Sequence, residues 1–223
     1  METVEAYRRG LEGEETMSEL LEHDVLVVNQ RPKLIEMTNE YDILDEAGNQ
    51  VGVIREEGQS KAKKLFRLLS DLDQFLTHRL AFYDAAGTKV LEFVRPAKVF
   101  KSTVEVSDGD GRPSGRIVQR NVFGKKRFAL EDAAGASLGS INAENLLSWD
   151  FAVEDQAGTE IGRITKQWAG ILREGFTTAD HYVVSMAHGL APETRRLVLA
   201  SASAIDTALK QDDSGGLGFG GFG

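Results

Sequence analysis

The sequence has no cysteine, only four prolines and no long apolar run among its 223 residues. Without cysteine there is no disulfide, thiolate metal ligand or thiol nucleophile, which fits a reducing compartment. No stretch approaches the roughly 18 consecutive apolar residues that indicate a transmembrane helix. The first residues, METVEAYRRGLEGEE, lack the apolar segment of a secretory signal. These absences predict a cytoplasmic protein.

Motifs of catalysis and metal binding are also scarce. The four histidines show no metal-binding spacing apart from His181 and His188, and no pattern of carboxylates accompanies that pair. Asp180 precedes His181, but adjacent residues of a strand face opposite sides. No Ser-His-Asp set, phosphate loop or dinucleotide fingerprint is visible. We therefore expect no enzyme activity, no cofactor and no metal.

Charge is unevenly distributed along the chain, whose formal net charge is −9. Residues 1–60 hold 15 acidic and 5 basic residues, residues 61–127 hold 7 and 15, and residues 128–223 hold 13 and 6. An acidic protein with a basic middle is poorly suited to nucleic acid, which needs many phosphate contacts. The basic middle suits an anionic phospholipid surface, unless the three regions interleave in space and cancel.

A unit of the form apolar-x-apolar-x-Asp-x-x-Gly-x-x-apolar-x-x-apolar occurs five times. Apolar alternation before the Asp predicts a strand with one buried face. The Asp side chain starts a turn by hydrogen bonding to nearby backbone groups of its own chain, and Gly accepts the positive φ that closes a hairpin. A second glycine inside four of the return strands suggests a bulge or a crowded backbone. The repeated positions are Asp45, Asp84, Asp108, Asp132 and Asp155, then Gly48, Gly87, Gly111, Gly135 and Gly158, and the second glycines Gly52, Gly115, Gly139 and Gly162.

Five consecutive hairpins form a meander, which at that length should curl and close. With the additional strands 25–29 and 182–186, the sequence predicts a mainly β fold with about twelve antiparallel strands in a closed barrel. Residues 1–24 are expected to form an acidic N-terminal arm, 25–210 the barrel domain, and 211–223 a disordered glycine-rich tail.

The stretch 193–210 predicts a helix about 27 Å long. Pro192 suits its first turn, and Glu193 favours the positive end of the helix dipole. Apolar and small residues cover nearly every side, which is typical of a buried helix. Only nine residues separate Arg196 from Asp206, too few to cross about 30 Å of hydrocarbon. We therefore place a slender helix inside the barrel, with buried positions at Leu197, Leu199, Ala202 and Ile205.

Two basic segments are candidate lipid contacts. SKAKKLFRLLSDLDQF (60–75) has leucines at helical spacing and a basic start formed by Lys61, Lys63, Lys64 and Arg67. Such an amphipathic helix lies on a membrane interface or docks on its own barrel. The cluster Lys125, Lys126 and Arg127 joins two hairpins and is either a solvated loop or a contact with anionic headgroups.

A hairpin barrel closed by an apolar C-terminal helix resembles the tubby-like architecture of phospholipid scramblases and LURP-one-related proteins. The segment IGRITKQWAGILREGFTTADHY (161–182) is similar to the most characteristic stretch of the scramblase family. NEYDILDEAGNQV (39–51), FVRPAK (93–98) and AIDTAL (204–209) are similar to the first hairpin, a strand end and the end of the buried helix. The likeness extends over about residues 21–210 and suggests a bacterial-type member without cysteines.

This resemblance implies energy-independent movement of phospholipid between leaflets, classically activated by calcium. In the stretch matching the family's calcium loop, only Asp180 keeps a carboxylate, so it is a vestige, because Ca²⁺ takes six to eight oxygens. The cysteines that carry palmitoyl groups in animal members are absent, and the basic segment 60–75 stands in their place. Trp168 is either a lipid-facing anchor or an aromatic plug at the barrel end.

Two functional hypotheses follow. In the first, the protein is scramblase-like, binds anionic phospholipid at the inner face of the cell membrane, and moves lipid. In the second, it is a soluble barrel that serves as a binding scaffold without lipid transport, since a barrel filled by its own helix has no lumen. Fold likeness alone does not decide between them.

Overall fold

The structure is a computed structural model that describes residues 17–30, 40–57, 77–96, 102–121, 124–145, 149–166 and 181–215. Twelve antiparallel strands form one closed barrel, in which each strand pairs with its neighbours in sequence and β1 closes the barrel against β12. The strands are β1 (Val25–Gln30), β2 (Glu40–Leu44), β3 (Gln50–Glu56), β4 (His78–Asp84), β5 (Lys89–Arg95), β6 (Thr103–Asp108), β7 (Pro113–Gln119), β8 (Arg127–Glu131), β9 (Ser137–Ala143), β10 (Asp150–Asp155), β11 (Glu160–Thr165) and β12 (His181–Met186). The twelve-stranded meander barrel predicted from the repeat is confirmed.

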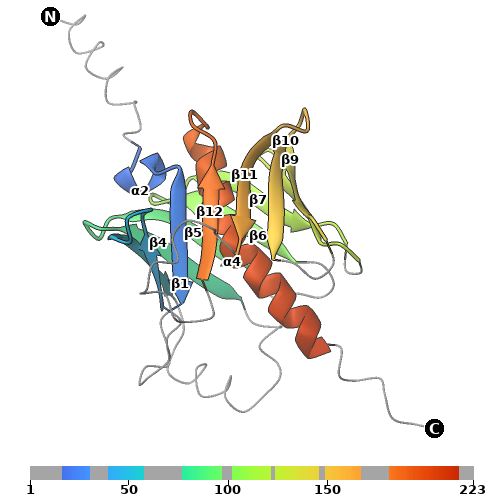
Figure 1. Cartoon of the computed structure of the whole chain (residues 1–223), viewed down its shortest axis with the longest axis horizontal. Helices are drawn as coiled ribbons and strands as arrows, with labels where there is room; N and C mark the ends of the chain where they lie inside the picture. Colours follow the sequence, from blue (N-terminus) through green and yellow to red (C-terminus); the bar gives the residue numbers. More distant parts are fainter. Residues whose placement is uncertain are drawn as a thin grey trace, which may run out of the picture.

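The helix α4 (Pro192–Gly215) runs through this barrel and emerges at the lower right of Figure 1. Its buried residues include Leu197, Leu199, Ala202 and Ile205, each 0% exposed, as the apolar pattern predicts. The predicted helix ended at Lys210, but α4 continues to Gly215. The added residues contain no proline, and the helix ends where the glycine-rich sequence begins.

The repeated Asp and Gly build the five hairpin turns in the same way. In the first turn, the Asp45 carboxylate accepts hydrogen bonds from the backbone N–H groups of Ala47 and Asn49, at 2.9 and 2.8 Å. Gly48 has a φ of 85°, the left-handed conformation that favours glycine. The turn-forming role predicted for the Asp residues is confirmed.

Each hairpin also contains a register shift just after its turn. The second glycines stand beside these shifts, where the backbone is crowded. A Cβ on Gly139 would lie 2.0 Å from the carbonyl oxygen of Glu154 in the next strand. At Gly115, a Cβ would also approach the side chain of Leu197 on α4, at 3.1 Å. These glycines therefore allow both close strand packing and close approach of the helix.

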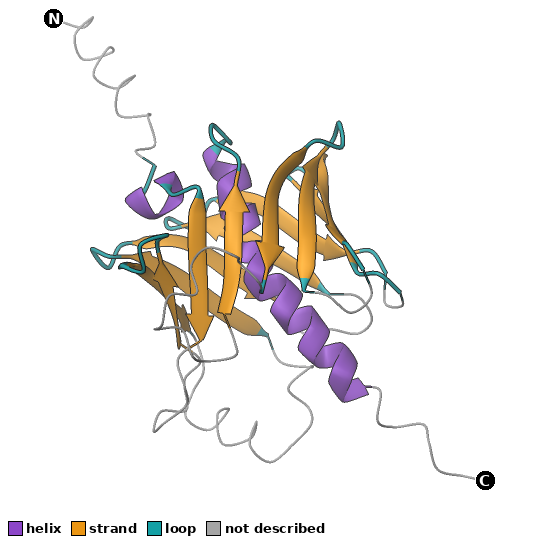
Figure 2. Cartoon of the chain, viewed as in Figure 1, coloured by secondary structure: helices purple, strands orange, loops and turns teal. Residues whose placement is uncertain are grey.

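A short helix, α2 (Glu19–Glu22), packs on the barrel where the chain enters β1 (Figure 2). Leu20 and Leu21 are 1% and 0% exposed and belong to the main core. The described part of the expected N-terminal arm, residues 17–24, thus contributes to the core. The two leucines are too few to show helical periodicity, so the sequence reasoning missed them.

Candidate functional site

The two ends of the barrel differ in their connections. At one end, which we call the turn end, each of the five hairpin turns spans four or five residues. At the other end, which we call the loop end, the strands are joined by longer segments of 6 to 21 residues. The helix α4 starts at the turn end and runs toward the loop end (Figure 1). Since loops carry most binding sites, the loop end is the place to look for function.

The described basic cluster lies at the loop end. Lys125 and Arg127 are exposed, and Lys126 is half-buried. The Lys125 ammonium donates to the carbonyl oxygen of Glu144 at 2.6 Å, and the Asn121 amide donates to the carbonyl of Lys125 at 2.6 Å. Lys125 is therefore held by hydrogen bonds to Asn121 and to Glu144, the residue that follows β9.

The other predicted contact residues, Lys61, Lys63, Lys64, Arg67 and Trp168, lie outside the described residues, as does Asp180. The described residues that flank these segments are all at the loop end, since β3, β4, β11 and β12 have the corresponding strand ends there. The connectivity thus attaches both segments to the same end of the barrel as Lys125–Arg127.

Inside the barrel, the side chains change character toward the loop end. Most of the interior is apolar, with fully buried residues such as Phe82, Phe93 and Leu130. The row of strand-end positions at the loop end contains polar and aromatic residues, of which neighbours such as His78 and Arg95 lie opposite each other. They are Glu56, His78, Arg95, Ser102, Gln119, Lys126, Trp149, Lys166 and Tyr182.

Much of this row is deeply buried. Arg95 and Gln119 are 1% and 0% exposed. His78 Nδ1 lies 3.3 Å from Glu56 Oε1, and the Gln119 side chain accepts a hydrogen bond from the backbone N–H of Ser102 at 3.2 Å. Buried charges and amides persist only when they are paired, so this row is a structured polar layer around the emerging helix.

The same layer contains an aromatic pair with a cation. The ring centroids of Trp149 and Tyr182 are 4.9 Å apart, and the Lys166 ammonium lies over both rings. The Tyr182 hydroxyl donates a hydrogen bond to the carboxylate of Asp206 on α4. This links the wall of the barrel to the helix. The sequence assigned none of these four residues to a functional site, because their convergence depends on strand register.

On the outer wall, Glu57 is held by a polar network across β3, β4 and β5. Its carboxylate accepts hydrogen bonds from the Tyr83 hydroxyl and from the Lys89 ammonium, the latter at 3.2 Å. The hydrogen bond from Tyr83, with the help of Lys89, lowers the pKa of Glu57. Burial alone would lower the pKa of Lys89, but its hydrogen bonds to Glu92 and Glu57 outweigh burial and raise that pKa. The residue that follows β3 at the loop end is therefore held by the Tyr83 hydroxyl and by an ion pair with Lys89.

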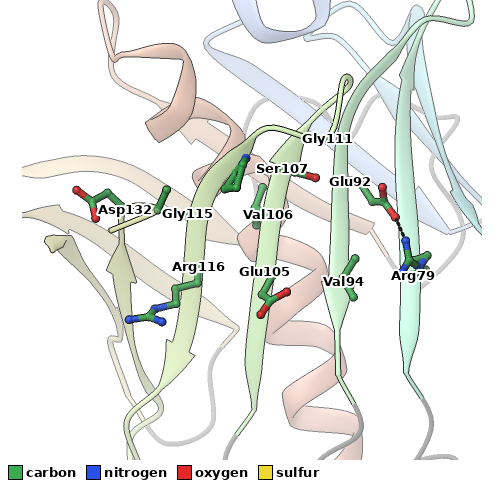
Figure 3. Close-up of a pocket in the computed structure, with 12 residues that line it drawn as sticks. Arg79, Glu92, Val94, Glu105, Val106, Ser107, Gly111, Gly115, Arg116 and Asp132 are labelled. Atoms are coloured by element: carbon green, nitrogen blue, oxygen red, sulfur yellow. Dashed lines mark hydrogen bonds and ion pairs between the residues drawn. The ribbon is translucent and has the colours of Figure 1, made fainter. Parts of the chain in front are cut away.

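An outer pocket of about 440 Å³ lies over β4 to β7 (Figure 3). Its two arginines are already engaged, Arg79 with Glu92 at 2.7 Å and Arg116 with Glu131 at 2.5 Å. Glu105 projects between them beside Val94 (Figure 3). Because both arginines of this pocket already have carboxylate partners, it is a weaker candidate site than the loop end.

At the turn end, Arg195 anchors the first turns of α4. It is 2% exposed and donates to the carbonyl oxygen of His23 at 2.6 Å and to the Asp24 carboxylate at 3.0 Å. The hydrogen bond from Arg195 lowers the pKa of Asp24. The helix therefore has side-chain contacts near both ends of the barrel. Arg195 bonds to the residues that precede β1 at the turn end, and Asp206 bonds to Tyr182 of β12 at the loop end.

Within the described ranges, no group of histidine and acidic side chains is arranged to hold a metal ion. Over those same ranges, no helix combines the length and apolar character needed to span a membrane.

Comparison with known proteins gives two relatives of similar description. The chain is 28% identical over 215 residues to a phospholipid scramblase family protein of Schizosaccharomyces pombe, covering 86% of this chain and 55% of the relative. It is 22% identical over 202 residues to phospholipid scramblase 2 of Homo sapiens, covering 82% of this chain and 66% of the relative. The chain therefore spans little more than half of the yeast protein and just under two thirds of the human one.

No solved structure matches the chain significantly. A family model does match, over residues 9–209, which include all twelve strands of the barrel and most of α4. Its description is Scramblase, in agreement with the resemblance seen in the Trp168 segment and the first hairpin. This chain belongs to the scramblase family.

Proposed function

We propose that this protein is a peripheral phospholipid-binding protein of scramblase type, which docks on the anionic inner face of the cell membrane with the loop end of its barrel. The observation that carries the proposal is family membership over residues 9–209. The names of both relatives, which specify phospholipid scramblase, support lipid as the ligand. We assign the protein no covalent chemistry and no nucleic-acid partner.

The distribution of basic residues supports the loop end as the docking face. Lys125 and Arg127 are exposed there, and the chain that carries Lys61, Lys63, Lys64 and Arg67 leaves and rejoins the barrel at that end. Each basic residue near an anionic surface contributes about 1 kcal/mol. Because the protein as a whole carries a charge of −9, binding should be weak and sensitive to salt.

A specific observation favours the alternative, a binding scaffold without lipid movement. The described interior of the barrel is filled by α4, whose residues 197–200 are 0% exposed. Lipid movement would then take place along the outer surface of the protein, or with the helix displaced. Binding and movement are therefore separate proposals and need separate measurements.

Flotation with liposomes tests the binding proposal. We expect the protein to float with anionic liposomes at low salt, less with neutral ones, and to lose flotation when Lys61, Lys63 and Lys64 are reversed to Glu. Two single charge reversals test which end of the barrel contacts the membrane. Lys125→Glu at the loop end should weaken flotation, whereas Arg112→Glu in an exposed position at the turn end should not. Calcium should change none of these results, since Asp180 alone cannot hold the ion.

Equal recovery of wild type and the triple reversal in the soluble fraction would favour the scaffold. The movement proposal is tested by reconstituting protein that floats and following a fluorescent lipid by chemical quenching of the outer leaflet. Binding without accelerated loss of the inner-leaflet signal would reject lipid movement and leave lipid binding in place.

A further inference from the structure

Three side chains on neighbouring strands converge inside the barrel at the loop end. Trp149 precedes β10, Lys166 follows β11 and Tyr182 lies in β12. These three strands are adjacent in the barrel. The backbone N–H of Lys166 donates to the carbonyl of Trp149 at 3.1 Å, and the preceding Thr165 is in register with Val183. The strand register therefore places the three side chains in one inward-facing row.

The aromatic pair already binds an ammonium group. The Nζ atom of Lys166 lies 4.4 Å from the ring centroid of Trp149 and 5.1 Å from that of Tyr182. Both distances are within the roughly 6 Å over which a cation is attracted to a ring face. The two rings are inclined by 35°, and Phe151 supports Trp149 edge-on with its centroid at 6.1 Å. The rings thus form a supported, two-sided surface for a cation.

A buried carboxylate strengthens this surface. The Tyr182 hydroxyl donates its hydrogen bond to Asp206, and the two residues are 2% and 5% exposed. A hydrogen bond from a phenol to a carboxylate increases the electron density of the ring, which raises its attraction for a cation. The negative charge acts in a region shielded from water, where electrostatic interactions are stronger.

We propose that Trp149 and Tyr182, backed by Asp206, form a binding site for the ammonium group of a choline or ethanolamine phospholipid headgroup, and that the Lys166 ammonium is its internal occupant. This inference rests on the proposed function and deepens it, because it names the headgroup chemistry. Lys166 is only half-buried and has a flexible four-carbon side chain, so it can withdraw when a headgroup is presented at the loop end. In this assignment the aromatic pair binds the ammonium, and Lys125, exposed at the same end of the barrel, binds the phosphate.

Substitution of Lys166 tests the site, because it removes the occupant and leaves the walls unchanged. The probe is soluble phosphocholine, and binding is measured by titration calorimetry. We expect Lys166→Ala to bind phosphocholine about tenfold more tightly than the wild type, the scale expected of two aromatic faces. Lys166→Arg keeps a cation on the rings and should show no gain. Arg112→Ala, the loss of an exposed cation at the turn end, should show none either.

Additional variants and ligands test whether the gain in affinity comes from an ammonium site. Adding Trp149→Ala to Lys166→Ala should abolish the gain. An absent gain in Lys166→Ala, a gain that survives Trp149→Ala, or an equal gain for inorganic phosphate would each overturn the ammonium site. Phosphoethanolamine in place of phosphocholine shows which headgroup is preferred. If Lys166→Ala does not retain a cooperative melting transition, Lys166→Met, which keeps an apolar chain of similar length, replaces it.

Vesicles distinguish the failure of this site from the failure of the proposed function. Lys166→Ala should gain affinity for phosphatidylcholine vesicles and not for phosphatidylglycerol vesicles, which carry no ammonium. A gain on soluble phosphocholine without vesicle binding by any variant would support the ammonium site and contradict membrane docking. Vesicle binding that is identical in wild type and Lys166→Ala for both lipids would contradict the ammonium site and leave membrane docking intact.

Discussion

At the scale of single residues, the most informative positions are the two glycines that four of the five hairpins contain, because the two are required for different reasons. Gly158 closes a turn with a φ of 80°, and nothing lies within 4 Å of its missing Cβ. Gly139 has a φ of 153°, and its missing Cβ would overlap the carbonyl oxygen of Glu154 at 2.0 Å. Gly158 is therefore required only for its backbone conformation. Gly139 is required for its backbone conformation and also because a side chain would clash with the next strand.

This difference predicts unequal costs for the same substitution. Gly158→Ala should lower the free energy of unfolding by about 1 kcal/mol, the cost of a left-handed alanine. Gly139→Ala should lower it by about 3 kcal/mol, because strained backbone and a clash with the next strand add. Chemical denaturation of both variants measures the two costs. Equal losses would show that the strands separate easily at Gly139 and that crowding is unimportant there.

At the scale of elements, the barrel and its helix fit each other through small residues on both sides. The wall approaches α4 at Gly115 and Gly162, where an added Cβ would lie 3.1 Å from Leu197 and 3.3 Å from Val198. The helix contributes the small residues Ala200 and Ala202, both 0% exposed. Close packing of this kind leaves little space for a larger side chain.

Ala202→Trp should therefore lower the free energy of unfolding by at least 1–3 kcal/mol through overpacking. Glu193→Trp, in the exposed first turn of the same helix, is the matched control and should stay within about 0.5 kcal/mol of the wild type. Melting curves of the two variants provide the comparison. An unchanged melting temperature in Ala202→Trp would place that face of the helix outside the barrel.

The sequence predicts this element level well, because its signals are local. Asp-x-x-Gly specifies each turn, alternation specifies each strand, and the all-round apolar stretch specifies a buried helix. The missed features are not local. The row that brings Trp149, Lys166 and Tyr182 together depends on register between separate strands, and the burial of Leu20 depends on packing against the barrel end. Nothing in the spacing of these residues along the chain indicates those contacts.

At the scale of the whole molecule, the meander gives the barrel two unlike ends. Because every hairpin turn falls at the turn end, every longer connection necessarily falls at the loop end. The basic segments, the polar inner layer and the ammonium-binding aromatic pair are all attached to that second end. The barrel therefore acts as a rigid scaffold that presents one chemically distinct face, and α4 ties the two ends together through Arg195 and Asp206.

This polarity predicts the orientation of the bound protein, and the absence of cysteine makes a direct test possible. A single cysteine carrying an environment-sensitive fluorophore can replace Asn145 at the loop end or Ala134 in an exposed turn at the turn end. With anionic vesicles, we expect a blue-shifted and brighter emission from position 145 and no change from position 134. The reason is that only the loop end would enter the poorly hydrated interfacial layer, where basic residues and apolar side chains together favour binding. A shift at position 134 with none at 145 would show that the protein binds through its turn end, and the docking face would have to be reassigned.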